Sequence, residues 1–142
     1  MIEWINKQHE SWEGTFKSSF FRNEDNSSEF TIYIENSSLT DYAEKCVESF
    51  NNLPDSLISD ICRGIIKYAE KGGINEEFEL PELGNVLDIL QYCWFNTVYV
   101  SVPEKMDSVR YIVEGEGDWG ECIGFIIENN QLAYVGIYYL EY

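Results

Sequence analysis

Residues 54 to 71 carry the clearest helical pattern in the chain, and this pattern constrains the fold more than any other feature. Apolar side chains recur there three and four residues apart, which places them along one side of a helix. Pro54 suits the first turn of such a helix, and Gly72 and Gly73 suit its end. The apolar positions are Leu57, Ile58, Ile61, Cys62, Ile65, Ile66 and Ala69.

This helix is expected to pack on a sheet through its apolar side. We therefore predict that Ile61 and Ile65 are buried, whereas Asp60 and Lys67 face solvent. Gly64 lies inside the helix, where glycine costs about 1 kcal/mol of helix propensity relative to alanine. The sequence leaves open whether Gly64 permits close packing or has no structural role.

The remaining pattern places β segments on both sides of a helical block. Another helix is expected over residues 39 to 52, because Ser38 and Asp41 form a capping box ahead of apolar residues at helical spacing. A short third helix, or less favourably a strand, is expected over residues 84 to 93. Strands are expected over residues 12–21, 30–35, 95–102, 109–114, 122–128 and 132–139, with a loop at 22–28 and a turn at 129–131.

These elements predict a single α+β domain over residues 1–142. Its sheet is expected to be mainly antiparallel, with two or three helices packed on one face. No internal repeat, linker or low-complexity segment divides the chain.

Acidic residues outnumber basic ones over most of the chain. There are 26 Asp and Glu residues against 9 Lys and Arg residues, and the formal net charge is −17. Residues 23–80 hold 13 acids against 4 bases, and residues 81–142 hold 10 against 2. Such a field repels nucleic acid and anionic membranes and speeds the approach of a basic partner. Acidity that only keeps the protein soluble explains the composition equally well.

The sequence also favours a soluble, cytoplasmic protein with reduced cysteines. It contains no apolar run of about 18 residues and no signal-peptide core near its start. The four cysteines are widely spaced and form no C-x-x-C pair, and the chain has one histidine, His9. We therefore predict free thiols rather than disulfides or a zinc site at Cys46, Cys62, Cys93 and Cys122.

No constellation typical of catalysis or of a cofactor is apparent. His9 has no cysteine or aspartate at motif spacing. Gly115 to Gly120 looks like a glycine-rich phosphate loop, but Glu114, Glu116 and Asp118 would repel phosphate. The same carboxylates together with Glu121 could hold Ca²⁺ or act as the acid and base of a glycosidase. The simpler interpretation is a solvated loop whose Trp119 either seals the core or contacts a partner.

A second acidic segment follows the helix expected over residues 54–71. Glu76, Glu77 and Glu79 surround Phe78 in what reads as an exposed loop. Carboxylates around one apolar residue suit contact with a basic protein, although an ordinary solvated loop has the same composition.

Several pieces of the chain resemble a known family. They are W-E-G-T-F at residues 12–16, S-F-F at 19–21, F-T-I-Y-I-E at 30–35 and G-D-W-G-E-C-I-G-F-I-I-E-N-N-Q-L-A-Y-V-G at 117–136. Together they are similar to small acidic bacterial domains of unknown function that are often found beside polymorphic toxins. Family members often place a histidine just before the glycine of the strand that is expected here over residues 122–128. This chain has Ile123 before that glycine, Gly124. Length and charge also resemble those of immunity proteins encoded beside wall-associated, contact-dependent toxins that cleave transfer RNA.

The resemblance implies a function in binding rather than in catalysis. It implies an immunity protein that binds and neutralises a basic toxin domain, a tRNA nuclease, in contact-dependent competition. The contact is expected at two acidic segments, formed by Glu76, Glu77, Phe78 and Glu79 and by Glu114, Glu116, Asp118 and Trp119. The alternatives are an acidic regulatory or scaffold module, or a small cation-binding or hydrolytic enzyme.

Overall fold

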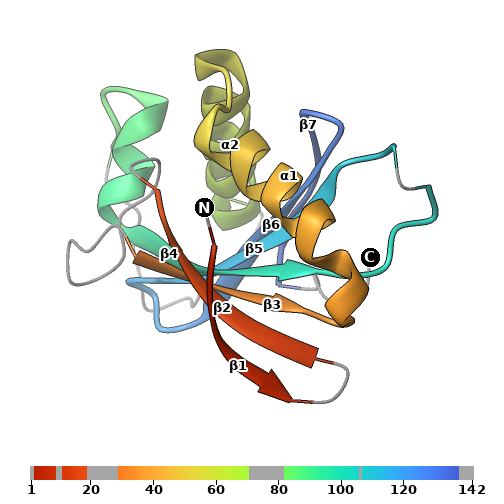
Figure 1. The fold of residues 1–142 in the computed structure, drawn as a ribbon. Coiled ribbons are helices and arrows are strands. Elements are labelled where there is room, and N and C mark those ends of the chain that lie inside the picture. The colour runs from red at the N-terminus through yellow and green to blue at the C-terminus, as the bar shows by residue number, and fades with distance from the viewer. Residues whose placement is uncertain (1, 9–10, 19–28, 71–81, 106, 138–142) are drawn as a thin grey trace.

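The core of the fold is a sheet whose strands lie side by side in the order in which the chain forms them. The computed structural model describes residues 2–8, 11–18, 29–70, 82–105 and 107–137 (Figure 1). Within these residues, seven strands form one sheet, and every neighbouring pair is antiparallel except β3 and β4. The strands are β1 Glu3–Gln8, β2 Ser11–Lys17, β3 Glu29–Ile34, β4 Cys93–Val100, β5 Arg110–Gly117, β6 Cys122–Glu128 and β7 Gln131–Gly136. The prediction of an α+β fold with a mainly antiparallel sheet is therefore confirmed.

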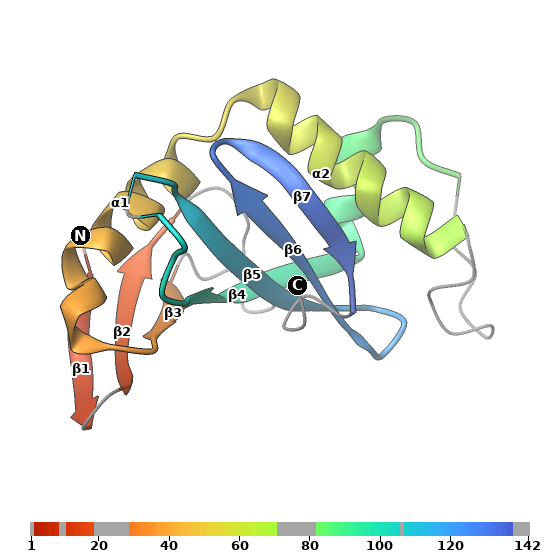
Figure 2. The same ribbon diagram turned by 90° about the vertical axis from the view of Figure 1, so that its right-hand side faces the viewer.

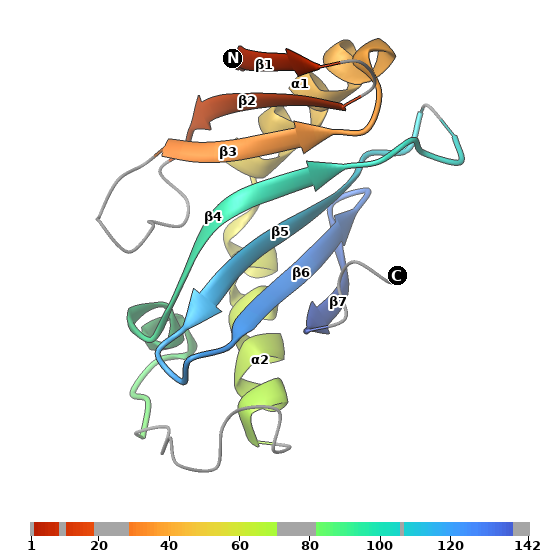
Figure 3. The ribbon, with the colours of Figure 1, turned by 90° about the horizontal axis from the view of Figure 1, so that it is seen from below.

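The helices occupy the connection between the two parallel strands. Parallel neighbours need a long crossover, whereas antiparallel neighbours can be joined by short turns. The crossover contains the 3-10 helix η1 Ser37–Leu39, helices α1 Thr40–Asn51 and α2 Asp55–Tyr68, and the 3-10 helix η3 Val86–Gln91. Figures 1 and 3 view the sheet from different sides, and α1 and α2 lie behind the strands in Figure 3.

The first strand is absent from the sequence-based prediction, which assigned no element to the residues before Trp12. Ile2 is buried and Trp4 packs against the core, but Ile5 is 58% exposed. The register between β1 and β2 shifts between Trp4 and Asn6. A bulge of this kind breaks the alternation of inward and outward residues by which a strand is recognised.

The two main helices have the predicted register. Ile61 and Ile65 of α2 are completely buried, and Asp60 and Lys67 are exposed. On α1 the buried side chains are Tyr42, Ala43, Cys46, Val47 and Phe50, all at the positions that the spacing indicated. The segment at residues 84–93 forms η3, with Asn85 and Asp88 making a capping box.

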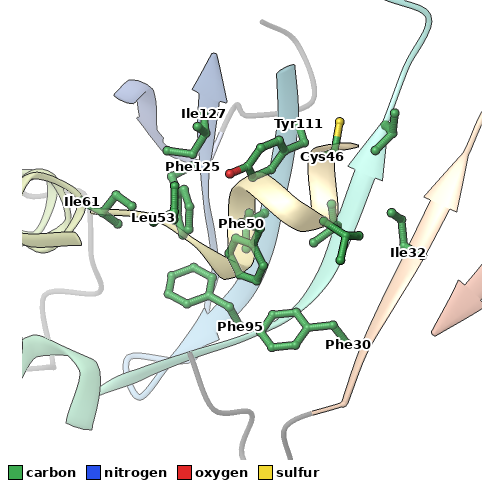
Figure 4. Packing of buried hydrophobic residues seen from close by; sticks show 14 of the residues in the cluster. Phe30, Ile32, Cys46, Phe50, Leu53, Ile61, Phe95, Tyr111, Phe125 and Ile127 are labelled. Carbon is green, nitrogen blue, oxygen red and sulfur yellow. The ribbon is translucent and has the colours of Figure 1, made fainter. Parts of the chain in front are cut away.

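Aromatic side chains from both halves of the chain meet beneath α1. Phe50 of α1 lies between Phe30 of β3, at 5.3 Å between ring centroids, and Tyr111 of β5, at 6.0 Å (Figure 4). Edge-on pairs at such distances stabilise a core beyond the area that they bury. This cluster ties α1 to strands on both sides of the junction between β3 and β4.

Several predicted boundaries differ from the structure. The strand expected over residues 12–21 ends at Lys17, and the predicted loop at 22–28 lies outside the described residues. The strand expected over residues 109–114 continues to Gly117. Among the described residues, no helix has the length and apolar character needed to cross a membrane.

The four cysteines are free, in agreement with the prediction. Burial raises the pKa of Cys46 and Cys93 to about 12 and that of Cys62 to about 11. These thiols therefore stay protonated at neutral pH, and a thiol is a poor nucleophile. Cys122, by contrast, is exposed.

The space next to Gly64 answers the question that the sequence left open. A Cβ atom at Gly64 would lie 2.8 Å from Cγ2 of Val135, on the β7 strand that runs beside α2 (Figure 2). Such a distance requires the neighbour to move, and a β-branched side chain has little freedom to do so. Gly64 therefore permits the close approach of α2 and β7.

A mutant cycle tests this role of Gly64. Gly64→Ala alone is expected to give no gain in the free energy of unfolding, because the close contact of the new Cβ with Val135 offsets the better helix propensity of alanine. In the Val135→Ala background the same change should stabilise by about 1 kcal/mol. Urea unfolding measures both values, and equal effects in the two backgrounds would contradict the close-packing role.

Native-state alkylation tests the burial of the thiols. Iodoacetamide at pH 8 should modify Cys122 in the folded protein, because Cys46, Cys62 and Cys93 are buried and protonated. All four thiols should react after unfolding in urea, and peptide mass spectrometry identifies the adducts. Cys122→Ser is the control and should abolish native-state labelling. Reaction of Cys93 at the rate of Cys122 would show that its surroundings open readily.

Candidate functional site

The structure describes one of the two acidic segments that the sequence singled out. Glu76, Glu77, Phe78 and Glu79 lie outside the described residues. Glu114 and Glu116 lie near the end of β5, and Asp118 and Trp119 lie in the turn that leads to β6. The candidate site is therefore built around the β5–β6 turn.

The glycines before this turn belong to a strand rather than to a phosphate loop. Gly115 faces inward, and a Cβ atom there would lie 1.8 Å from the backbone oxygen of Trp94 on β4. A Cβ atom at Gly117 would lie 2.2 Å from the indole ring of Trp119. Both positions need glycine because other groups approach the backbone closely. The glycine-rich pattern thus reflects packing, and reading it as a loop ended the predicted strand too early.

Trp119 lies in the core and is only 3% exposed. Its ring covers Gly117 inside the end of β5, so Trp119 does not form the exposed anchor that was one of its two expected roles. The turn itself is held by backbone hydrogen bonds. The Asp118 N–H donates to the carbonyl of Tyr92 at 2.7 Å, and the Gly117 N–H donates to that of Glu121 at 3.1 Å.

This arrangement directs the carboxylates away from the core. Glu114 and Glu116 alternate with the inward-facing Gly115 and Gly117, so both carboxylates lie on the opposite face of the sheet. Glu114 is half-buried, whereas Glu116 and Asp118 are exposed. Within the described part of the chain, no three Asp, Glu, Cys or His side chains are placed to hold a metal ion. The carboxylates of the turn form an acidic surface there.

A row of side chains crosses the sheet on the face to which Glu114 points, and we call this face the outer face. Each member is paired in register with the next one on the neighbouring strand. Ile112 and Ile126 near one end of the row are buried, and Tyr99 and Tyr134 pack against them. The row is formed by Glu13, Tyr33, Tyr99, Ile112, Ile126 and Tyr134.

Two of the three tyrosines in this row, Tyr33 and Tyr99, form a stacked pair. The rings of Tyr33 and Tyr99 lie 5.5 Å apart between centroids, with 19° between their planes. Tyr33 is 37% exposed. The Tyr99 hydroxyl donates to Oε1 of Glu114 at 3.4 Å. This pair was not predicted from the sequence. Both tyrosines occupy outward positions in the alternating segments at 30–35 and 95–100, and this placement could have indicated that they lie on the exposed face.

The surroundings keep both phenols neutral. Desolvation by burial is the largest cause that raises the pKa of Tyr33, followed by the negative charges of Glu13 and Glu114. The pKa of Tyr99 is raised by burial first and by Glu114 second. Two neutral aromatic rings therefore lie between two carboxylates.

An open cavity of about 860 Å³ lies at the β6–β7 end of the outer face. Ile126 and Tyr134 line it, as do Lys105, Arg110 and Glu128. Arg110 and Glu128 form an ion pair at 3.4 Å. The cavity has the volume of a small-molecule site, but its wall carries cations and anions together and indicates no single ligand chemistry.

Substitution of Trp119 distinguishes a core residue from a partner contact. Trp119→Ala should lower the free energy of unfolding by about 3–5 kcal/mol, because it removes a buried ring and leaves a cavity. Urea unfolding followed by circular dichroism measures the change. Glu116→Gln on the exposed side of the same segment is the control and should change stability by no more than about 0.5 kcal/mol. Wild-type stability of Trp119→Ala would show that the ring is dispensable to the core.

Comparison with protein families gives a match, whereas the other comparisons do not. No curated protein and no solved structure matches the chain. A family model described as a domain of unknown function (DUF6985) matches residues 2–142, nearly the whole sequence. The description assigns no activity to the family. By this match over almost its full length, the chain belongs to the DUF6985 family.

Proposed function

We propose that this protein is an immunity protein, which binds a basic toxin domain and blocks it without any turnover of its own. The observation that carries the proposal is the outward display of Glu114, Glu116 and Asp118 by a segment whose other residues are committed to the core. The toxin domain is proposed to be a nuclease that acts on transfer RNA, and the complex is proposed to form in the cytoplasm of the producing cell.

The charge balance supports a basic partner. The chain has 26 carboxylate residues and 9 Lys and Arg residues, so at least 17 carboxylates have no cation of their own in the chain. Two of the cations are paired internally, Arg63 with Asp60 and Arg110 with Glu128. A surplus of this size speeds encounter with a positive surface, and added salt weakens the attraction by screening it.

A nuclease is a suitable partner because its own function requires positive charge. A surface that holds RNA phosphates must present lysine and arginine side chains. An acidic protein competes for the same groups with charge-paired contacts. The resemblance to domains found beside polymorphic toxins points to the same class of partner.

The proposed interface lies on the outer face of the sheet and at the β5–β6 turn. In this proposal the helices cover one face of the sheet and leave the outer face for the toxin. Tyrosine supplies large, rigid contact area at protein interfaces, and carboxylates around it supply orientation. The segment with Glu76, Glu77, Phe78 and Glu79 is proposed as a second part of the same contact.

Co-expression tests the proposed function. Cells that produce the toxin domain encoded beside this protein should survive when the protein is present, and the purified pair should form a complex. Survival without a complex would indicate a chemical or regulatory mechanism, and absence of rescue would remove the immunity function.

Charge reversal tests the proposed surface in the same complex. Glu116→Lys with Asp118→Lys should slow association about tenfold at low salt and weaken the dependence of the rate on salt, because local steering is lost. The matched control is Glu48→Lys with Glu70→Lys, which makes the same change in net charge at exposed positions in the last turn of α1 and just after α2. Equal slowing by both pairs would show that only the overall charge matters.

A further inference from the structure

The outer face carries a stacked pair of tyrosines, and the acidic composition of the chain does not explain this pair. Tyr33 and Tyr99 come from β3 and β4, which lie far apart in the chain and pair in register. Their rings are nearly parallel at 5.5 Å between centroids, and Tyr33 exposes 37% of its surface. An aromatic surface is therefore accessible at the centre of the sheet.

Carboxylates lie on both sides of this aromatic surface. Glu13 is the register partner of Tyr33 on β2, and after burial its negative charge is the next cause that raises the pKa of Tyr33. Glu114 accepts a hydrogen bond from the Tyr99 hydroxyl at 3.4 Å, and its charge acts on both phenols. A carboxylate has two oxygens with about four lone-pair sites, so it can accept more than one hydrogen bond.

One side chain matches an accessible aromatic face between two carboxylates. The guanidinium group of arginine is planar, stacks on aromatic rings and donates in a fork that fits a carboxylate. The lysine ammonium is compact and strongly hydrated, and it gains less from a ring face. The chain already places a cation over an aromatic ring elsewhere, with Nζ of Lys7 lying 5.2 Å from the ring centroid of Trp12.

We propose that Tyr33, Tyr99, Glu13 and Glu114 form a receptor for an arginine side chain of the partner. This inference rests on the proposed function, because it assumes that a basic protein docks on the outer face. It adds the anchoring residue: one arginine, stacked on Tyr33 and held by the flanking carboxylates. The remaining acidic residues then serve approach and orientation.

A peptide titration tests the receptor without the toxin. The probes are acetyl-Gly-Arg-Gly-amide and its lysine counterpart, titrated into the full chain and followed by the aromatic NMR signals of Tyr33 and Tyr99. The arginine peptide should shift both sets of signals and bind about threefold or more tightly than the lysine peptide. Equal affinity of the two peptides, or shifts confined to other residues, would overturn the receptor.

Paired variants separate the contribution of the Tyr33 ring to binding from that of its hydroxyl. They also separate the effect of the Glu114 charge from that of the overall charge of the protein. Tyr33→Phe keeps the ring face and should retain the preference for arginine, whereas Tyr33→Ser should lose it. Glu114→Gln should weaken binding of the arginine peptide, and Glu48→Gln on α1 is the matched control that should not. Unfolding in urea confirms that each variant is folded.

The same variants in the toxin complex separate the two proposals. A complex that forms and is unaffected by Tyr33→Ser and Glu114→Gln would overturn the arginine receptor and leave the immunity function in place. Failure of any toxin complex, combined with selective binding of the arginine peptide at Tyr33 and Tyr99, would remove the immunity function and leave the receptor.

Discussion

The parallel pairing of β3 with β4 is the constraint on which the rest of the structure depends. It joins the first three strands to the last four within one sheet, and it forces the chain between Ile34 and Cys93 to cross over. Both α-helices lie in that crossover. Phe50 of α1 then packs against Phe30 on one side of the junction and Tyr111 on the other. The same pairing brings Tyr33 next to Tyr99, so the junction that organises the core also creates the aromatic centre of the outer face.

The acidic turn shows how packing decides which groups a strand presents. Gly115 and Gly117 leave room for the backbone of β4 and for the ring of Trp119. Because these inward positions are filled by close contacts, the intervening Glu114 and Glu116 point to the outer face. A segment that resembles a phosphate loop in sequence thus becomes the end of a central strand, with a negative surface. Its glycines and its carboxylates have separate physical roles.

In the proposed complex, the charges and the aromatic pair make complementary contributions to binding. Carboxylates spread over the chain act at a distance and accelerate encounter, but exposed charges contribute little affinity because water and salt screen them. Stacked tyrosines act only at contact and supply rigid area with two neutral rings. A surface that combines both is suited to a basic protein that must be captured rapidly and then held in one orientation.

The sequence by itself determined the local elements and the overall chemistry. Helical spacing determined the register of α1 and α2 down to the burial of Ile61 and Ile65, and alternation located most of the strands. The sequence did not predict the elements in which backbone contacts override the local pattern. The bulge near Trp4 interrupts the alternation of β1, and the close approach at Gly115 requires glycines that are typical of a loop at the end of β5. Only the tertiary structure decided that Trp119 lies in the core and that Glu13, Tyr33, Tyr99 and Glu114 come together. Their proximity depends on the register of β3 with β4, and no short turn connects these two strands to set that register locally.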